Sequence, residues 1–286
     1  MRKTLLLLAA AVATTACSPS TIALRTTARL VANGRPALRG ESDPDVAKAS
    51  LPAQLKLLEG LLVGDPENAD LLSALAEGWT GYAFLFIEDE DPARAAAFYK
   101  RAASYGLRML GRRQEWRGLD AKNADDLEEL LARAEAADVP ALFWTATAWA
   151  GWANMDKTDP AALAALPKAA RMMAQVLRLD PAFENAGADL FFGVYYASRP
   201  RIAGGDPSKA LVHFGRAFER TGRRYLPAQV LMMRSYAAGE LDEELFKRLA
   251  AEVAAADAAA LSDARLANEV AKRKAKALLE RFDELF

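Results

Sequence analysis

The chain has 286 residues, of which 52% are hydrophobic and 26% charged, a balance that excludes wholesale disorder. Its net charge of −1 leaves no basic excess with which to bind nucleic acid. One cysteine and one histidine exclude an intramolecular disulfide, a thiolate zinc cluster and a multi-histidine metal site, so we expect no metal and no cofactor.

Residues 1–16 have the pattern of a lipoprotein signal peptide. Arg2 and Lys3 precede a short apolar run, and small residues lie directly before Cys17. The run is too short to cross a membrane as a permanent helix. The pattern resembles the bacterial lipobox, which implies that the chain is cut before Cys17 and that this residue is acylated. The alternative is an ordinary signal peptide with an incidental cysteine. By resemblance to the lipoprotein sorting rule, Ser18 in place of Asp favours the outer membrane.

The mature sequence is predicted to be helical throughout, because Ala, Leu, Glu, Arg and Lys dominate and no alternating β-branched stretch occurs. Residues 17–42 combine a weak helical pattern with Pro, Gly and polar residues, and we interpret them as a tether from the membrane. From residue 43 onward, Asp-Pro pairs punctuate the chain. Each pair predicts a helix start, because an Asp N-cap accepts backbone N–H groups and Pro loses nothing at the first helical position.

The Asp-Pro pairs indicate an internal duplication. The first three follow one another as Asp43, Asp65 and Asp91, and the second three lie 116, 115 and 115 residues later. The same register pairs Gly78 with Gly193 and Tyr99 with Phe214. We therefore predict two tandem helical modules, residues 43–157 and 158–286.

Each module has the small-against-aromatic pattern of tetratricopeptide (TPR) hairpins. Ala95, Tyr99 and Ala102 recur at helical spacing and share one face. The predicted fold is all-α, an α-solenoid of divergent TPR-like hairpins. A solenoid buries its core only by stacking neighbours, and its concave face suits binding more than catalysis.

The sequence contains no catalytic constellation. His213 corresponds to Phe98 in the repeat register, which indicates a packing position, and no Ser/Asp or Cys partner is marked for it. The acidic run Glu88–Asp91 lacks the alternating oxygen ligands and glycine turn of a calcium loop, and we interpret it as a solvated loop. We therefore predict that the protein is not an enzyme.

Two aromatic stretches are candidates for a ligand site. Trp149 and Trp152 share a face of a helix that is apolar around much of its circumference, which fits either solid core or the wall of a cavity. Tyr195 and Tyr196 run into Arg199, which could bind a carboxylate or could cap the last carbonyls of its helix. We hypothesise that these five residues border one apolar cavity with an anion-binding edge, suited to an amphipathic organic acid.

These residues resemble the T component of tripartite ATP-independent periplasmic (TRAP) transporters, a divergent TPR lipoprotein family. The resemblance implies an all-helical periplasmic protein without catalytic residues, which partners the solute-receptor subunit and forms a homo-oligomer, with a trimer as the leading candidate. The stretches that carry it, over nearly all of the mature chain, are LPAQLKLLEGLL, AEGWTGYAFLFIEDEDPARAAAFYKRA, YGLRML, PALFWTATAWAGWAN, LDPAFENAGADLFFGVYYASRPRIAGGDPSKALVHFGRAFE and AKALLERFDELF.

Two other functions compete with a receptor-docking transport protein. The first is a TPR lipoprotein scaffold for envelope or outer-membrane protein assembly, which would use its concave face for protein partners alone. The second is a helical peptidoglycan lyase with a single catalytic acid, for which Glu77, beside Gly78 and Trp79, is the residue to test.

Overall fold

The computed structural model describes residues 19–286, so the predicted signal peptide and Cys17 lie outside the described residues. The described chain forms fourteen α-helices and no strand, which confirms the predicted all-α fold. Within this part, no helix is both long and apolar enough to cross a membrane. The helices are α2 (Pro19–Asn33), α3 (Arg35–Arg39), α4 (Pro44–Gly64), α5 (Ala69–Tyr82), α6 (Pro92–Leu110), α7 (Ala124–Leu131), α8 (Val139–Met155), α9 (Pro160–Leu179), α10 (Phe183–Ala197), α11 (Pro207–Thr221), α12 (Pro227–Met232), α13 (Glu243–Ala255), α14 (Arg265–Glu280) and α15 (Phe282–Leu285).

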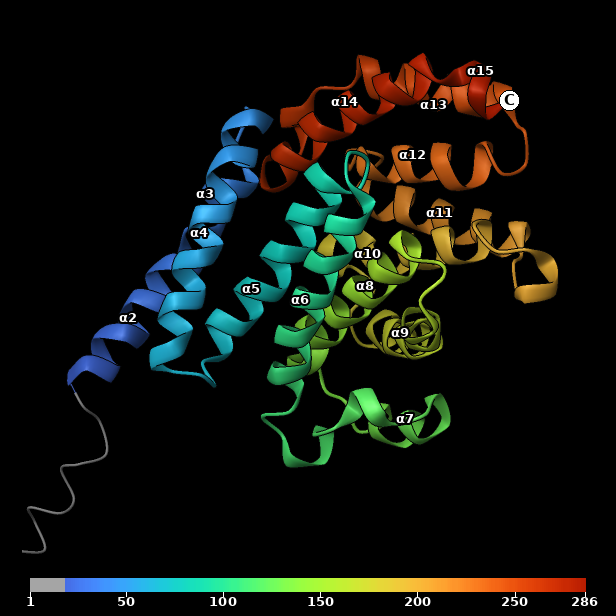
Figure 1. The fold of residues 1–286 in the computed structure, drawn as a ribbon. Coiled ribbons are helices and arrows are strands. Elements are labelled where there is room, and N and C mark those ends of the chain that lie inside the picture. Colours follow the sequence, from blue (N-terminus) through green and yellow to red (C-terminus); the bar gives the residue numbers. More distant parts are fainter. Residues whose placement is uncertain (1–18) are drawn as a thin grey trace, which may run out of the picture.

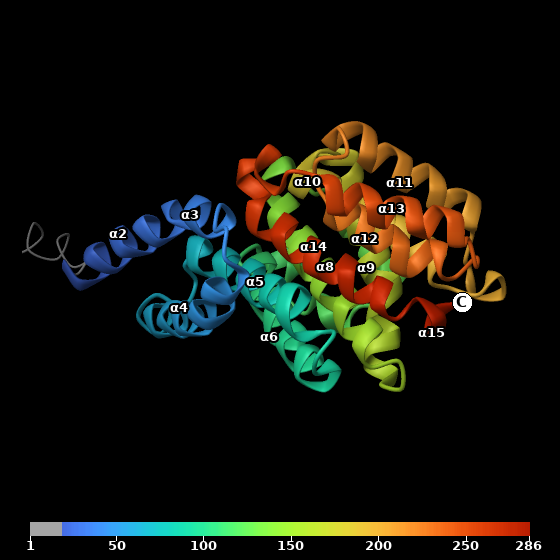
Figure 2. The same ribbon diagram turned by 90° about the horizontal axis from the view of Figure 1, so that it is seen from above.

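The helices stack as antiparallel neighbours into one curved array. α5 packs on α6, α6 on α8, α8 on α9, and α10 on α11. α2, α3 and α4 form an arm on one side of the array, and α14 and α15 extend toward the opposite side (Figures 1 and 2). The segment predicted as a tether is therefore helical from residue 19 on, and α2 packs against α4 and α5 with Ala28 buried.

Four of the six Asp-Pro pairs begin a helix as predicted. The N-cap carboxylates that accept a backbone N–H are those of Asp43, Asp91, Asp159 and Asp206. The helix-start prediction was wrong for the other two pairs, because Asp65 and Asp180 instead end α4 and α9. Asp65 bonds to Arg25 and Asn68, and Asn68 caps α5 in its place.

Matched positions of the predicted repeat have the same packing role. Gly78 lies beneath Leu55, and a Cβ added there would be 2.4 Å from Leu55 Cδ2. Its counterpart Gly193 lies beneath Phe214, where an added Cβ would be 3.0 Å from the ring. Both glycines therefore let a large side chain of the neighbouring helix approach the backbone.

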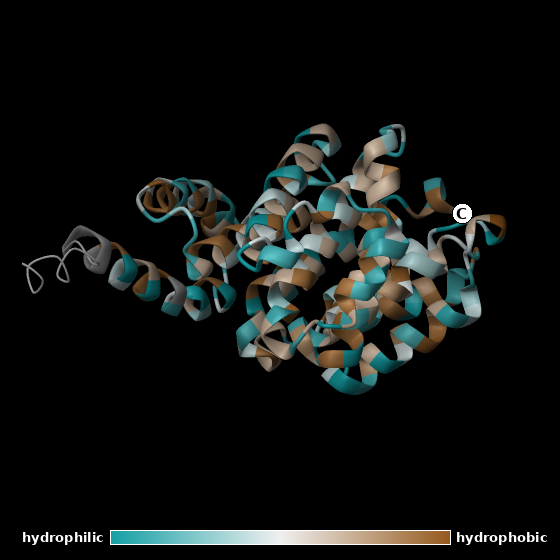
Figure 3. Cartoon of the chain, turned by 90° about the horizontal axis from the view of Figure 1, so that it is seen from below, coloured by the Kyte–Doolittle hydropathy of each residue, from teal (hydrophilic) through white to brown (hydrophobic). Residues whose placement is uncertain are grey.

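The hydrophobic core does not stop where the first predicted module ends. One cluster of buried residues contains Trp149 from α8 together with Ala165 and Met172 from α9, on the two sides of residue 157. Along most helices hydrophobic and hydrophilic residues alternate, the pattern of amphipathic helices that each bury one face (Figure 3). The two modules thus remain a prediction about duplication, and their hairpins share packing as neighbours in a solenoid do.

Candidate functional site

A cavity of about 900 Å³ lies between the first helices of the array and α10, α12 and α14. This volume is in the range of small-molecule sites, which are concave and mostly apolar. α4, α5, α8 and α10 supply most of the wall, and the start of α14 completes it. Its larger apolar side chains include Leu51, Leu55, Leu58, Tyr82, Phe143, Trp144, Leu190 and Phe191.

The face of α8 toward the cavity carries a different tryptophan from the pair predicted. Trp144 and Thr147 line the cavity, whereas Trp149 and Trp152 are not part of its lining. Trp149 is 4% exposed and packs beneath Lys168 of α9, while the ring of Trp152 lies 4.5 Å from the ammonium nitrogen of Lys100 on α6. Five residues along a helix correspond to about 140° of rotation, so Trp144 and Trp149 cannot share a face.

Two of the three residues predicted at the end of α10 and just after it reach the cavity. Tyr195 and Arg199 line it, and the guanidinium carbon of Arg199 lies 4.4 Å from the centroid of the Tyr195 ring. Tyr196 instead faces α11, where it stacks on His213 with ring centroids 5.8 Å apart. Consecutive helical residues differ by about 100° in direction, so Tyr195 and Tyr196 could not both face the cavity.

The cavity wall carries polar groups that find no partner within the described part of the chain. Arg199 is half-buried and forms neither an ion pair nor a hydrogen bond with any described residue. The hydroxyl oxygen of Thr147 is buried without a hydrogen-bond partner. Lys157 lies beyond the end of α8 in the same lining. An unpaired buried hydroxyl is costly, and an unpaired guanidinium in the same lining is available to a carboxylate, so Thr147 and Arg199 could bind an anionic, hydrogen-bonding ligand.

An ion-pair cluster occupies the end of the cavity near α3. One guanidinium nitrogen of Arg39 lies 2.6 Å from a carboxylate oxygen of Glu77 and 2.6 Å from one of Glu184. Arg35 lies 3.0 Å from the other oxygen of Glu77. Burial raises the pKa of Glu184, although the charge of Arg39 opposes the rise. Glu77, the acid considered for a lyase, is thus held between two arginines.

The first turn of α10 has a strained backbone at the cavity wall. Glu184, Asn185 and Ala186 have φ values of 47°, 57° and 61°, in the left-handed region. Each such non-glycine residue costs about 1–2 kcal/mol, so the surroundings must hold the turn in place. Two contacts hold it. Arg39 binds Glu184, and the ring of Phe183, the residue before Glu184, packs against Phe143 with ring centroids 5.2 Å apart.

A second buried cluster ties α14 to the cavity wall. Glu88 accepts a hydrogen bond from the Tyr99 hydroxyl at 2.9 Å and one from Arg234 at 2.9 Å. Lys274 of α14 lies 3.3 Å from Glu88 and donates to the carbonyl of Phe84, in a single turn of π-helix. Burial and the charge of Glu88 raise the pKa of Tyr99. The prediction of a solvated acidic loop was therefore wrong for Glu88, which is 5% exposed.

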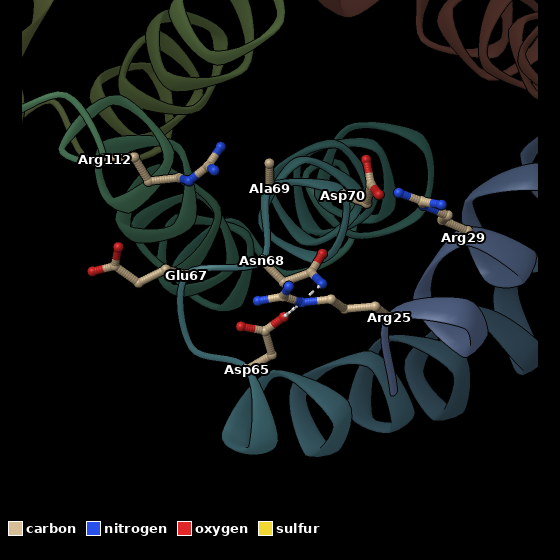
Figure 4. A pocket seen from close by; sticks show the side chains of 8 residues that line it. All are labelled: Arg25, Arg29, Asp65, Glu67, Asn68, Ala69, Asp70 and Arg112. Carbon is tan, nitrogen blue, oxygen red and sulfur yellow. Dashed lines mark hydrogen bonds and ion pairs between the residues drawn. The ribbon is translucent and has the colours of Figure 1, made fainter. Parts of the chain in front are cut away.

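A smaller pocket of about 320 Å³ lies where α2 meets the α4–α5 turn (Figure 4). Three arginines and three acidic residues line it, and Arg25 donates to Asp65 at 3.0 Å. Because its charges are balanced and it lacks an apolar wall, it is not a candidate ligand site. Within residues 19–286, no group of His, Cys, Asp and Glu side chains could hold a metal ion.

His213 occupies a packed position between α10 and α11. Its Nδ1 lies 2.8 Å from the buried carboxylate of Asp189, and its ring stacks on Phe192. The prediction that no Asp partners His213 was wrong, because Asp189 of α10, 24 residues earlier in the chain, binds its ring. The arrangement is that of a buried polar pair that orients two helices.

Comparisons with known proteins identify the kind of molecule that contains this cavity. A sequence model described as TRAP transporter T-component matches residues 40–286. A relative from Treponema pallidum (strain Nichols), named only "Uncharacterized protein", is 26% identical over 190 residues. The matched region covers 61% of this chain and 59% of the relative, so the chain spans somewhat more than half of that relative's length.

Proposed function

The chain belongs to the TRAP transporter T-component family, and on that premise we propose that it docks the solute-receptor subunit and holds or relays an amphipathic organic acid. As a member of this family, the protein is an accessory component of a TRAP transport system and is associated with the membrane or the periplasm. The family has no known catalytic function. The docking, the ligand and the anchoring described below are the proposal.

The cavity is the observation that carries the ligand part of the proposal. Its apolar wall would bury a hydrocarbon chain, with a gain of about 0.8 kcal/mol for each CH₂ removed from water. Arg199 and the Thr147 hydroxyl both belong to the cavity lining and have no hydrogen-bond partner among the described residues. A carboxylate at Arg199 and an apolar chain along α8 would satisfy both features of the cavity.

Partial cover of the cavity by α14 favours this function over the scaffold. A TPR scaffold would present an open concave face to a protein partner. Here the start of α14 contributes Leu266 to the cavity wall, and Lys274 anchors the same helix to Glu88. The concave face is thus partly covered, an arrangement that suits a small ligand better than a peptide or protein.

We further propose how the protein is held at the membrane. Acylated Cys17 would anchor it on the periplasmic side, with the outer membrane favoured by Ser18. A homo-oligomer, with a trimer as the leading candidate, would present several cavities to the receptor. Several buried acyl carbons at about 0.8 kcal/mol each would hold such an assembly without a transmembrane helix.

Titration calorimetry with decanoate, and with decanol as the uncharged analogue, tests the ligand part. The purified protein should bind decanoate more tightly than decanol, and Arg199→Ala should remove most of that difference. Arg201→Ala is the matched control, because Arg201 is exposed and outside the cavity lining. Equal affinity of the wild-type protein for decanoate and decanol would contradict the proposed anion site.

A further inference from the structure

The cavity follows α10 from its first turn to its end. The residues of α10 that line it are spaced alternately three residues and one residue apart, so they form one continuous stripe along the helix. They are Gly187, Leu190, Phe191, Val194, Tyr195 and Ser198. Trp144, Thr147 and Gly151 form a stripe of the same kind on α8. The cavity is therefore an elongated channel, with α8 and α10 along its sides.

The carboxylate site proposed at Arg199 lies far from the start of α10. A Cβ added at Gly187, in the second turn of α10, would lie 2.5 Å from the ring of Phe143 near the start of α8, so both helices begin at the same end of the channel. Tyr195 and Ser198 follow Gly187 by eight and eleven residues, which at about 1.5 Å per residue corresponds to about 12 and 17 Å. The guanidinium of Arg199 lies over the Tyr195 ring, within this interval.

Two unpaired polar side chains lie at the opposite end, beside the start of α10. Asn185 and Tyr225 both line the cavity and are half-buried, and neither side chain forms a hydrogen bond with any residue in the described part of the chain. Asn185 follows Glu184 directly. Burial raises the pKa of Tyr225 and the nearby charge of Glu184 raises it further, which places the phenol beside the same carboxylate.

The charges at this end of the channel are already balanced. Arg39 lies 2.6 Å from a carboxylate oxygen of Glu77 and 2.6 Å from one of Glu184, and Arg35 lies 3.0 Å from Glu77. A second anionic group of a ligand would therefore add an excess negative charge here. The unpaired amide and phenol beside the cluster are neutral, and each can both donate and accept a hydrogen bond. A ligand hydroxyl, which also does both, suits this end better than a second carboxylate.

The backbone fixes the amide at the channel wall. Asn185 has a φ of 57°, between Glu184 and Ala186, which are also left-handed. Such strain persists only where the surroundings hold it, and it clusters at ligand-binding and active sites. The contact at Asn185 is thus formed in advance, so a ligand would lose little affinity in ordering it.

We propose that the ligand is a long-chain acid with a hydroxyl at the far end of its chain, bound by its carboxylate at Arg199 and by that hydroxyl at Asn185 and Tyr225. This inference rests on the proposed function and specifies its substrate class. An extended carbon chain advances about 1.25 Å per carbon, because its C–C bonds of about 1.5 Å form a zigzag. The interval of about 12–17 Å along α10 then corresponds to about 10–14 carbons.

Titration calorimetry on the purified protein compares each ω-hydroxy acid with the unsubstituted acid of the same length, from octanoate to tetradecanoate. In 8-hydroxyoctanoate the hydroxyl would end among apolar side chains, so it should weaken binding about tenfold or more. In 12-hydroxydodecanoate or 14-hydroxytetradecanoate it would reach the polar end and should tighten binding about threefold to tenfold. A hydroxyl that weakens binding at every length would overturn the inference, and so would tighter binding of tetradecanedioate than of 14-hydroxytetradecanoate.

Asn185→Gly and Tyr225→Phe test the two contacts. Glycine adopts a φ of 57° readily and phenylalanine keeps the ring, so both variants should fold. The double variant should lose the preference for the hydroxy acid over its parent acid. Tyr236→Phe is the matched control, because Tyr236 is also half-buried without a side-chain hydrogen bond to a described residue, and it is not part of the cavity lining. A double variant that keeps the wild-type preference would overturn the proposed contacts.

The parent acids separate this inference from the function on which it rests. If dodecanoate and tetradecanoate bind the wild-type protein but their ω-hydroxy forms bind more weakly, the hydroxyl site is wrong and the proposed acid-binding function stands. If neither parent acid nor decanoate binds, the ligand part of the proposed function fails together with the inference.

Discussion

Filling the cavity from Gly81 should block ligand binding while making the protein more stable. Gly81 lies within α5 on the cavity lining, and a Cβ added there would have no neighbour within 4 Å. Leucine at this position would project four carbons into space that the proposed ligand occupies. Most substitutions that destroy a binding site also destabilise the fold, so a stabilising one is a sharp test.

The expected magnitudes follow from helix propensity and from burial. Glycine in a helix interior costs about 0.8–1 kcal/mol relative to the best helix formers, so Gly81→Leu should raise the unfolding free energy by about 0.7 kcal/mol. Contact of the new side chain with the apolar wall should add to that gain. If the leucine displaces three ligand methylenes at about 0.8 kcal/mol each, decanoate affinity should fall about 50-fold.

Gly60→Leu is the matched control for this experiment. Gly60 lies within α4, is exposed, has the same free space around its Cβ, and is not part of the cavity lining. It should gain similar helix stability in urea unfolding and should bind decanoate as the wild-type protein does. The cavity assignment would be refuted by a Gly81→Leu variant that is stable, helical and still binds decanoate with wild-type affinity.

Three further predictions concern the buried charges and the anchor. Glu88→Ala should cost about 3 kcal/mol in urea unfolding, because it leaves the half-buried Arg234 and Lys274 with Asp89 as their remaining carboxylate, whereas Glu90→Ala at an exposed pair should cost less than about 1 kcal/mol; equal losses would contradict the buried cluster. Burial raises the pKa of Glu184, so the stability contributed by its protonated form is full below the ordinary pKa of 4.5 and is lost as the pH rises from 4.5 through the raised pKa; Glu184→Gln, which cannot ionise, should lack this loss in urea unfolding, and the same pH dependence in both chains would refute this. Metabolic labelling with a fatty-acid analogue should mark the wild-type chain and not Cys17→Ser, and an unlabelled wild type would contradict lipidation.

Local sequence signals predicted the helices and much of their pairing. An Asp at the N-cap and a Pro at the next position act within one turn, so Asp43 and Asp206 could be assigned from sequence alone. The failure at Asp65 also has a local cause, because Asn68 competes for the cap three residues later. Gly78 and Gly193, which the predicted repeat register pairs, both face a large side chain of a neighbouring helix.

The side of a helix that faces the cavity could not be predicted in the same way. α8 is apolar around nearly its whole circumference, so Trp144, Trp149 and Trp152 all fitted a buried face. Which tryptophan meets the cavity depends on where α6, α9 and α10 lie. No local signal separates the stripe through Trp144, Thr147 and Gly151, which lines the cavity, from the stripe through Thr145 and Trp149, which is core.

Long-range partners account for the remaining differences. Glu88 appears in the sequence as part of an acidic run, but Arg234 and Lys274 bind it from 146 and 186 residues away. The left-handed turn at Glu184 contains no glycine, so the sequence gives no signal for it. The turn is held by Arg39, 145 residues earlier in the chain. Both features are fixed by tertiary contacts that override local preference.

The central claim, that the cavity holds an amphipathic acid with its carboxylate at Arg199, is tested most directly by a crystal structure with 10-bromodecanoate. The account predicts one anomalous bromine peak among the apolar side chains of α8 and α10, with the carboxylate within hydrogen-bond distance of the Arg199 guanidinium. A bromine peak outside the cavity, or a bound carboxylate remote from Arg199, would contradict it.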